Sequence, residues 1–563
     1  MIVAIVGAGQ SGLTTAKTFI EKGIDIVVFE KSNSNGLFYN IKEKDYFKWS
    51  SSKYISSFSD FPIPKNYPIW MSINQFIQYL NAYKKKFNLD KYINYNTEVI
   101  KCIPKNNQWI ITYRKHSFLY SITVDKLIIT TGLNSTPKYP NLNNYSGAIF
   151  HGDDIYKMSK TEWKDNFNNK KILLLGGGES AFDVGHILVN NTKKLYFSTK
   201  NYIEWFPEWG YNKNEFKKCR KKNPAYFWYD YPSDTMLTYL EYSLPGPISG
   251  LWHNYGKVIF LGGTKKCSHT HFFLWDRGAN TSKKLCNITK TPQSLFKKYV
   301  VKRTPFMCDI NDNLVNIINY PIKYCGKNVI TKKEIIKNVD IIICCTGYKK
   351  QFNFLDDKYY KCNLIKKIIS TNNKNLAFIG FARPTMGSIN SISEMQSWWT
   401  YLYFTNNLKY KIRNFKWGRP QDPLNIKNEH VNTIIIGNYY YRDLALDMNI
   451  HPNMKLLFLK NPKLWLQILF SSIHPTVFRL KGEFKHKNAK KFIYNLPSYK
   501  QQSKESGWVF YMFLFILLHI IFITFIVYLS KFLFKTLLNN KFSNIYKNVF
   551  TIFSIMYTYT YWY

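Results

Sequence analysis

The sequence predicts an α/β protein that contains two dinucleotide-binding units of the Rossmann type. Each unit is recognisable as a short apolar strand, a glycine-rich turn, an amphipathic helix and a second strand. The first unit runs from a strand at Ile2–Val6 through the turn Gly7–Gly12 to a strand at Ile24–Phe29. The second begins with a strand at Ile172–Leu175, followed by the turn Gly176–Ala181.

The first glycine turn has the residues that a diphosphate site needs. A pyrophosphate must lie close to the free N–H groups at a helix N-terminus. Gly7 permits a tight turn, Gly9 lets the phosphates approach the backbone, and Gly12 lets helix and strand pack closely. Glu30 ends the second strand, where a carboxylate accepts hydrogen bonds from ribose hydroxyls and repels a 2′-phosphate. This unit is therefore predicted to bind FAD or NAD rather than NADPH.

The second unit differs at the position that follows its second strand. A helix is expected over Phe182–Val189 and a strand over Lys194–Ser198, after which no acidic residue follows. Thr199 and Lys200 stand there instead, and Lys200 can meet a 2′-phosphate, which favours NADPH; a plain surface lysine is the alternative. The expected NADPH contacts are Gly176, Gly178, Ser180, Ala181, Thr199 and Lys200. A flavin site and a nicotinamide site together imply hydride transfer.

Composition favours a globular protein of two or three domains. The chain has 563 residues, of which 45% are hydrophobic, and a net charge of +43. Such a charge is compatible with nucleic-acid binding, but the lysines are scattered and accompany other residues with A/T-rich codons. We therefore expect no nucleic-acid partner. The nine cysteines include no CxxC pair, so neither a disulfide framework nor a zinc site is predicted.

Two strand-and-turn elements mark where the chain passes between the domains. Lys126–Thr130 runs into Thr131-Gly132, and Asp340–Cys345 runs into Thr346-Gly347-Tyr348. Trp205–Cys325 shows no assignable pattern and is expected to line the substrate route. The predicted domains are an FAD-binding domain in two parts (1–160 and 336–415), an NADPH-binding domain with an insertion (161–335), a basic C-terminal region with potential to associate with a membrane (416–505), a transmembrane helix (507–529) and a basic, aromatic tail (530–563).

The run Gly507–Leu529 carries no formal charge. As a helix it measures about 34 Å, and a hydrocarbon core is about 30 Å thick. We predict that it anchors the chain in a membrane. Basic residues flank both of its ends, so charge does not fix its orientation. Because Met1 leads directly into an apolar strand and a glycine turn, no signal peptide is expected, and the catalytic domains should lie in the cytosol.

Several motifs appear in the order typical of one family. GAGQSGL with Glu30 is followed by Gly36-Leu37-Phe38, then by SSK at 51–53 and FSDFP at 58–62. TGY at 346–348 and the block at 375–396, which includes Glu394, come later. Taken together, these residues resemble the flavin-containing monooxygenases, class B flavoproteins that include the plant YUCCA enzymes. Besides Gly7, Gly9, Gly12 and Glu30, the expected FAD residues are Gly36, Leu37, Phe38, Thr131, Gly132 and Glu394, the last as a group that orients backbone near the flavin.

Two positions depart from the family pattern. In the linker before the second glycine turn, Gly147 and His151 fit the family, Gly152 replaces a serine, and Ile155 is not the tryptophan of the Baeyer–Villiger version. The linker therefore does not select a subgroup, and His151 is interpreted as a hinge or packing residue. Ser50 stands where the family has an asparagine before SSK, and it is the candidate catalytic residue, with a shorter reach and one donor instead of two.

The resemblance also implies a mechanism. NADPH delivers hydride to FAD, O2 adds at flavin C4a, and the resulting hydroperoxyflavin oxidises a soft nitrogen or sulfur of a small molecule while NADP⁺ stays bound. It further implies the endoplasmic reticulum as the membrane. Two alternatives remain open at this point: an NADPH oxidase or reductase of the same fold without productive oxygenation, and a non-enzymatic membrane-bound flavoprotein scaffold.

Overall fold

The fold is described from a computed structural model. The described residues are 1–200, 203–205, 234, 239, 299–301, 304–384, 387–408, 434–435 and 437–497. The predicted transmembrane segment 507–529, the tail 530–563 and much of the predicted substrate region lie outside them. Across the part of the chain that is described, no helix has the length and apolar character needed to cross a membrane.

The first domain is built on a seven-stranded sheet. The order of its strands is β20 (Leu364–Ile365), β21 (Ile369–Ser370), β22 (Leu376–Phe378), β7 (Lys126–Ile129), β1 (Ile2–Val6), β2 (Asp25–Phe29) and β3 (Ile93–Asn94). The apolar strand β1 pairs in parallel with β2 on one side and β7 on the other. It is buried on both faces because the sheet is covered on both.

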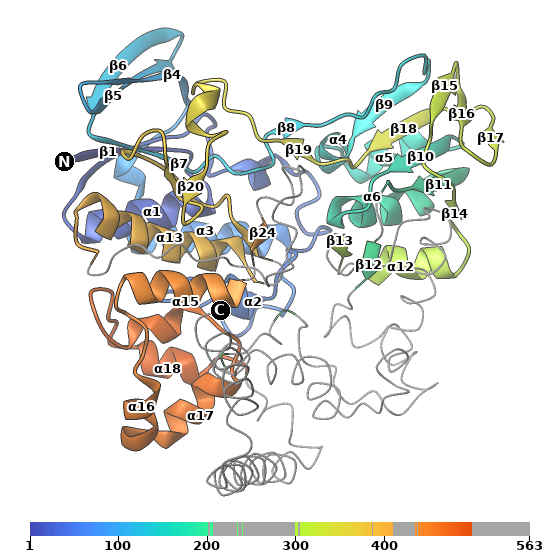
Figure 1. Cartoon of the computed structure of the whole chain (residues 1–563). Helices are drawn as coiled ribbons and strands as arrows, with labels where there is room; N and C mark the ends of the chain where they lie inside the picture. Colours follow the sequence, from blue (N-terminus) through green and yellow to red (C-terminus); the bar gives the residue numbers. More distant parts are fainter. Residues whose placement is uncertain are drawn as a thin grey trace, which may run out of the picture.

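The two coverings of this sheet are of different kinds (Figure 1). One face carries helices, and Val3 and Ile5 of β1 point into that core. The other face carries a three-stranded antiparallel sheet, and Ala4 and Val6 point toward it. The covering elements are α1 (Gln10–Glu21), α3 (Ile73–Lys86) and α13 (Ile389–Phe404) on the first face, and β4 (Thr97–Lys105), β5 (Gln108–Lys115) and β6 (Phe118–Val124) on the second.

The second domain is built on a five-stranded parallel sheet. Its strand order is β14 (Asn316–Ile317), β11 (Lys194–Ser198), β10 (Lys171–Leu175), β18 (Ile341–Cys344) and β9 (Ala148–His151). The elements around it are α4 (Gly152–Tyr156), α5 (Lys160–Phe167), α6 (Glu179–Val189), α12 (Thr304–Asn311), β15 (Lys323–Cys325), β16 (Asn328–Ile330) and β17 (Ile335–Ile336). Cys344 and Cys345 are buried here as small apolar side chains.

Two chain crossings join the domains, as the sequence predicts. Thr131-Gly132 follows β7 of the first sheet, and Thr346-Gly347 follows β18 of the second. Just beyond these turns the crossings pair with each other as the antiparallel strands β8 (Thr136–Pro137) and β19 (Tyr348–Lys349). Figure 1 shows this pair between the two domains.

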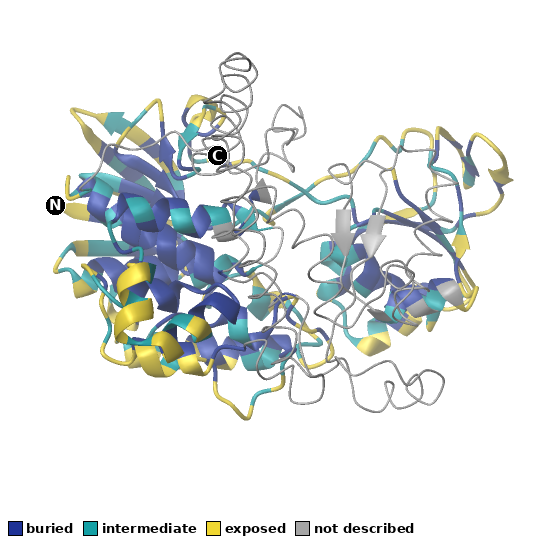
Figure 2. Ribbon diagram, turned by 60° about the horizontal axis from the view of Figure 1, so that its bottom comes forward, coloured by how far each residue is buried: buried dark blue, intermediate teal, exposed yellow. Residues whose placement is uncertain are grey.

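A layer of C-terminal helices covers the first domain below α13 (Figure 1). Figure 2 shows the buried interior of this domain in dark blue. It consists of α15 (Gly437–Asp447), α16 (Met454–Lys460), α17 (Pro462–Phe470), the 3₁₀ helix η7 (Pro475–Arg479) and α18 (Ala489–Tyr494). Tyr440 and Leu444 of α15 are fully buried in the same core as α1 and α13. Residues 437–497, expected from sequence only as a basic region, are therefore part of the first domain.

The predicted glycine-turn units match the structure closely. β1 and β11 have the predicted bounds, and β2 begins one residue later than predicted. The prediction that a helix begins at Phe182 was wrong, since α6 begins at Glu179. Gly178 is its N-cap, and an acidic side chain in the first turn is favoured by the helix dipole.

Candidate functional site

A cleft of about 1940 Å³ lies between the two domains and is lined by both glycine turns. Nearly all of the residues predicted to bind a cofactor line it. These are Gly7, Gly9, Glu30, Gly36, Leu37, Phe38, Thr131 and Gly132 from the first domain, and Gly176, Gly178, Ser180, Thr199 and Lys200 from the second. Ser50 lines the cleft as well. Residues that are far apart in the chain thus converge on one space.

Each glycine of the first turn has a different structural role. Gly7 adopts φ +102°, which favours glycine, and a Cβ there would approach the Thr130 carbonyl oxygen to 3.0 Å. A Cβ on Gly12 would lie 2.0 Å from the Gly7 oxygen, so Gly12 is required for packing. A Cβ on Gly9 would have only the Gly36 Cα near it, at 3.9 Å. The space beside Gly9 is therefore open, as an approaching diphosphate requires.

The start of α1 is suited to hold an anion. Gly9 is its N-cap, and no side chain caps the free N–H groups of the first turn. The Gln10 side-chain oxygen is buried without a hydrogen-bond partner in the described part of the chain, and Gln10 lines the cleft. The open space at Gly9 and the uncapped helix start together fit the diphosphate of FAD.

Glu30 holds the first turn in place. One carboxylate oxygen accepts a hydrogen bond from Ala8 N–H at 2.8 Å, and the other accepts from the Ser32 N–H and hydroxyl at 3.0 and 2.7 Å. The Asn35 amide, a contact that the sequence did not single out, donates to the Ala8 carbonyl at 3.1 Å. Glu30 therefore lies at the turn, in the position from which a carboxylate reaches ribose hydroxyls.

The second turn repeats the geometry of the first. Gly176 has φ +132°, and a Cβ there would meet the Cys345 oxygen at 2.2 Å. Gly178 has nothing within 4 Å of its would-be Cβ, and it is the N-cap of α6 without side-chain capping. Ala181 does not line the cleft; it is fully buried and takes the packing place that Gly12 has in the first turn. Thr199 is buried and Lys200 exposed at the cleft wall.

Residues 36–38 and 47–51 form a further part of the cleft wall. Gly36 has φ +86°, and its would-be Cβ lies 3.1 Å from the Gly9 Cα, so Gly36 must be small for this segment to touch the first glycine turn. Phe38 packs edge-on against Trp49 at 4.9 Å between ring centroids. Ser50 is exposed to the cleft, and the neighbouring Ser51 hydroxyl donates to the Gly387 carbonyl at 3.1 Å.

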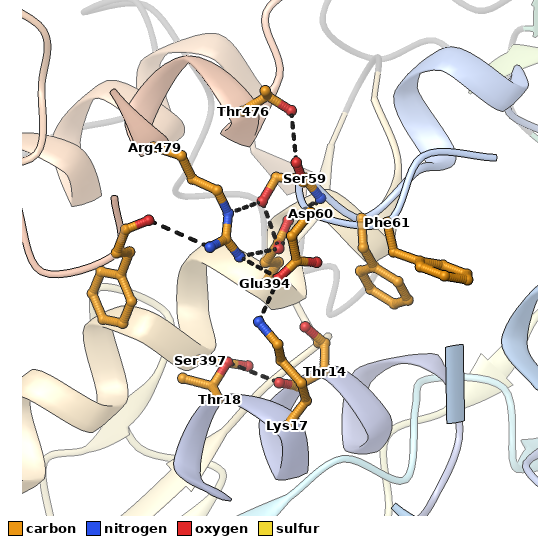
Figure 3. A network of polar contacts seen from close by, with 12 residues as sticks. Thr14, Lys17, Thr18, Ser59, Asp60, Phe61, Glu394, Ser397, Thr476 and Arg479 are labelled. Carbon is orange, nitrogen blue, oxygen red and sulfur yellow. Dashed lines mark hydrogen bonds and ion pairs between the residues drawn. The ribbon is translucent and has the colours of Figure 1, made fainter. Parts of the chain in front are cut away.

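Glu394, expected as an FAD residue that orients backbone near the flavin, does not line the cleft. It is 1% exposed, and its carboxylate accepts hydrogen bonds from Ser59 N–H at 3.0 Å and from the Ser59 hydroxyl at 2.7 Å. Arg479 lies 3.0 Å away as its ion-pair partner (Figure 3). Glu394 thus orients backbone, as expected, but it does so in a buried charged network beneath the cleft.

His151 joins the two chain crossings at the edge of the cleft. Its Nδ1 accepts from Asp153 N–H, so its Nε2 carries the proton and donates to the Gly347 carbonyl at 3.0 Å. Tyr139 and Tyr348 pack against the ring. Burial lowers the pKa of His151, which keeps the ring neutral near pH 7. The interpretation of His151 as a hinge or packing residue agrees with this geometry.

Comparison with known proteins decides the family. The profile of the family described as flavin-binding monooxygenase-like matches residues 1–223 and 314–529. The chain belongs to this family. Flavin-containing monooxygenase 1 of the dog is 27% identical over 537 residues, covering 87% of this chain and 91% of its own length. Human flavin-containing monooxygenase 2 is 24% identical, with the same coverage.

Solved structures of flavin monooxygenases share the fold. A cyclohexanone monooxygenase with bound ε-caprolactone has a TM-score of 0.52 at 14% identity, covering 79% of this chain and 96% of its own. A structure of OTEMO in complex with FAD and NADP has a TM-score of 0.50 at 14% identity, covering 72% and 86%. This chain is an NADPH-dependent monooxygenase that contains FAD.

Proposed function

We propose that this monooxygenase transfers one oxygen atom from O2 to a soft nitrogen or sulfur of a small molecule. The observation that carries the proposal is the convergence of two open glycine turns on one cleft, each at an uncapped helix start. Such a cleft can hold FAD and NADPH face to face. When bound, FAD reduced by NADPH supplies the activation of O2.

The residues of the chain have separate tasks in this proposal. The first turn, with Glu30, binds the FAD diphosphate and ribose, and the second turn binds NADPH. Lys200, with Thr199, contacts the 2′-phosphate, because a lysine at the open end of that strand meets the phosphate charge. Ser50, which lines the cleft, donates a hydrogen bond toward the reacting oxygen. With both cofactors bound, the walls of the cleft shield the reacting atoms from water.

The proposal includes membrane attachment through residues 507–529, with the catalytic domains on the cytosolic side of the endoplasmic reticulum. Support comes from the sequence: the apolar run is long enough to span, and the second stretch matched by the family profile ends at the residue where this run ends. Full-length protein should remain with membranes after a carbonate wash. If it appears in the wash, the anchor is wrong.

The decisive experiment measures four quantities on one preparation: NADPH consumed, O2 consumed, peroxide released and oxygenated product formed, with a panel of tertiary amines and thioethers. Oxygen transfer predicts that product accounts for most of the NADPH consumed with at least one amine or sulfide. The specific observation that favours an NADPH oxidase instead is the serine at position 50. Peroxide in equal amount to NADPH, with no product across the panel, would establish the oxidase.

A further inference from the structure

Arg479 lies at the centre of a buried charged cluster that the cofactor assignments do not use (Figure 3). Its guanidinium is 2.9 Å from the carboxylate of Asp60 and 3.0 Å from that of Glu394, and it donates to the Ser59 hydroxyl. Lys17 forms a second ion pair with Asp60. None of the four charged side chains is more than 5% exposed.

The cluster joins three elements that line the cleft, at their ends away from it. Lys17 lies on α1, about 10 Å along the helix from Gln10 at the cleft. Glu394 lies on α13, about 7.5 Å beyond the cleft residue Ile389. Ser59 and Asp60 end the segment 50–60, called here the Ser50 loop, which contains the one-turn helix α2 (Lys53–Ser56). Arg479 itself comes from the C-terminal layer, so it connects that layer to the cleft walls.

Three contacts lay the Ser50 loop along the first turn of α13. The Ser51 hydroxyl donates to the Gly387 carbonyl at 3.1 Å. The Ser391 hydroxyl donates to the carbonyl of Ile55, and the Asn390 amide donates to that of Ser56 at 2.8 Å. Glu394 continues the series one turn further by accepting from the N–H and hydroxyl of Ser59. The Glu394 carboxylate therefore fixes the end of this loop at Ser59.

Resting on the oxygen-transfer function proposed above, we propose that Arg479 is a positioning residue for that reaction. By fixing Glu394 and Ser59, it keeps the Ser50 loop against the start of α13, so that the cleft wall stays closed to water. The fraction of consumed NADPH that yields oxygenated product rather than peroxide then depends on Arg479. This side chain belongs to the C-terminal layer and does not line the cleft.

The electrostatics of the cluster support this dependence. Burial by itself would raise the pKa of Asp60, but Arg479 and Lys17 hold it below its ordinary value. Burial raises the pKa of Glu394, and Arg479 is the main group that opposes this. Without the guanidinium, two buried carboxylates would face Lys17 alone, and a buried charge that has lost its partner destabilises its surroundings. The group most affected is Glu394, which holds the loop.

The chain offers a matched control. Lys366 is also a buried cation between two carboxylates, 2.6 Å from Asp443 and 3.1 Å from Asp447, with side chains no more than 2% exposed. Both of these ion-pair partners lie on α15, and neither belongs to the Ser50 loop. Loss of a buried cation as such can therefore be separated from loss of the contact to Glu394.

The experiment compares Arg479→Gln, Arg479→Lys and Lys366→Gln in the full-length holoenzyme, measuring melting temperature, bound FAD and peroxide released per NADPH consumed. We expect all three variants to melt lower. Peroxide per NADPH should rise roughly threefold or more in Arg479→Gln, rise less in Arg479→Lys, which keeps the charge, and stay at the wild-type level in Lys366→Gln.

If a single variant fails to fold, a charge-balanced double variant takes its place in the comparison. Arg479→Gln with Glu394→Gln, and Lys366→Gln with Asp443→Asn, each remove one cation and one anion. The proposal is overturned if the Arg479 variants release no more peroxide per NADPH than wild type, or if the Lys366 variants release equally more. Failure of the oxygen-transfer function looks different, because wild-type protein itself would then form no product.

Discussion

Ala8 N–H donates a hydrogen bond of 2.8 Å to the carboxylate of Glu30, so the end of β2 closes the glycine turn that follows β1. The second oxygen of Glu30 holds the N–H and hydroxyl of Ser32. A residue that the sequence predicts to contact the ribose therefore also shapes the turn that is proposed to receive the diphosphate. The two tasks can be separated by substitution, since only the first needs the charge.

Replacement of Glu30 should separate these tasks. Glu30→Gln keeps an oxygen that can accept from Ala8, so the turn should persist while FAD binds about tenfold more weakly, or about 1.4 kcal/mol. Glu30→Ala leaves the buried Ala8 N–H without its acceptor, so the protein should be purified with little flavin and melt lower. Flavin absorbance per protein and thermal melting measure both effects. A fully yellow Glu30→Ala protein would contradict the role of Glu30 in the turn.

The glycines of the first turn should respond differently to a single methyl group. Gly12→Ala puts a Cβ 2.0 Å from the Gly7 oxygen, a backbone clash, so little folded protein is expected. Gly9→Ala meets only the Gly36 Cα at 3.9 Å, so the protein should fold but stay colourless, because the methyl group occupies the space of the diphosphate. Circular dichroism and flavin absorbance distinguish the outcomes. A yellow Gly9→Ala protein would exclude the diphosphate from this position.

Local sequence patterns predict the cofactor halves of this fold because each is a short-range signal. A strand of apolar residues, a glycine turn and a helix follow one another within about 30 residues, and each is dictated by backbone sterics or by the helix period. β1 and β11 were predicted to the residue on this basis. The convergence of both turns on one cleft follows from the general placement of ligands at the carboxyl ends of parallel strands.

The C-terminal layer and its charged cluster were missed for a related reason. Arg479 binds Ser59, and these two residues are 420 positions apart in the chain. No local period encodes such a pairing, and an arginine in a strongly basic sequence looks like one more surface charge. The residues of α13 are buried on nearly all sides, so this helix shows little of the polar face by which an amphipathic helix is recognised. The resemblance implies a place for Glu394 near the flavin, whereas its ion pair with Arg479 is a contact that no motif encodes.

The nicotinamide preference should depend on Lys200. Removing its charge in Lys200→Ala costs an interaction with a doubly charged phosphate group, which is worth about 1.5–3 kcal/mol, so KM for NADPH should rise roughly tenfold or more. KM for NADH should hardly change, because NADH has no 2′-phosphate. Steady-state kinetics with both cofactors measure the ratio. An equal change for NADPH and NADH would show that Lys200 does not read the phosphate.

The side chain at position 50 should control how much peroxide is released per NADPH consumed. Ser50→Asn introduces a longer side chain with two N–H donors, one more than the serine hydroxyl provides. We expect peroxide released per NADPH to fall by about a factor of two or more, with the rate of flavin reduction unchanged, since the substitution acts after hydride transfer. Ser50→Ala is the control and should move the ratio in the opposite direction. If neither variant changes the ratio, Ser50 has no part in oxygen transfer.

The attachment of the C-terminal layer should weaken in mild acid because of His474. This side chain is 2% exposed; its Nε2 donates to the Ser57 carbonyl at 2.9 Å, and its Nδ1 accepts from the Thr476 hydroxyl at 2.7 Å. The contact at Nδ1 needs the neutral ring, because a protonated Nδ1 cannot accept a hydrogen bond. Burial, with a smaller contribution from nearby Arg479, lowers its pKa from 6.5 to about 4.

Between those two pH values the unfolded chain binds a proton at His474 that the folded chain does not. Stability therefore rises with pH through this window and is lost as the pH falls from 6.5 toward about 4. His474→Gln removes the titration and keeps a donor and an acceptor, so the difference in unfolding free energy between wild type and variant should shrink from about pH 7.5 to about pH 5. Urea unfolding at both pH values measures it. If wild type and variant differ in unfolding free energy by the same amount at both pH values, His474 is not held neutral between Ser57 and Thr476.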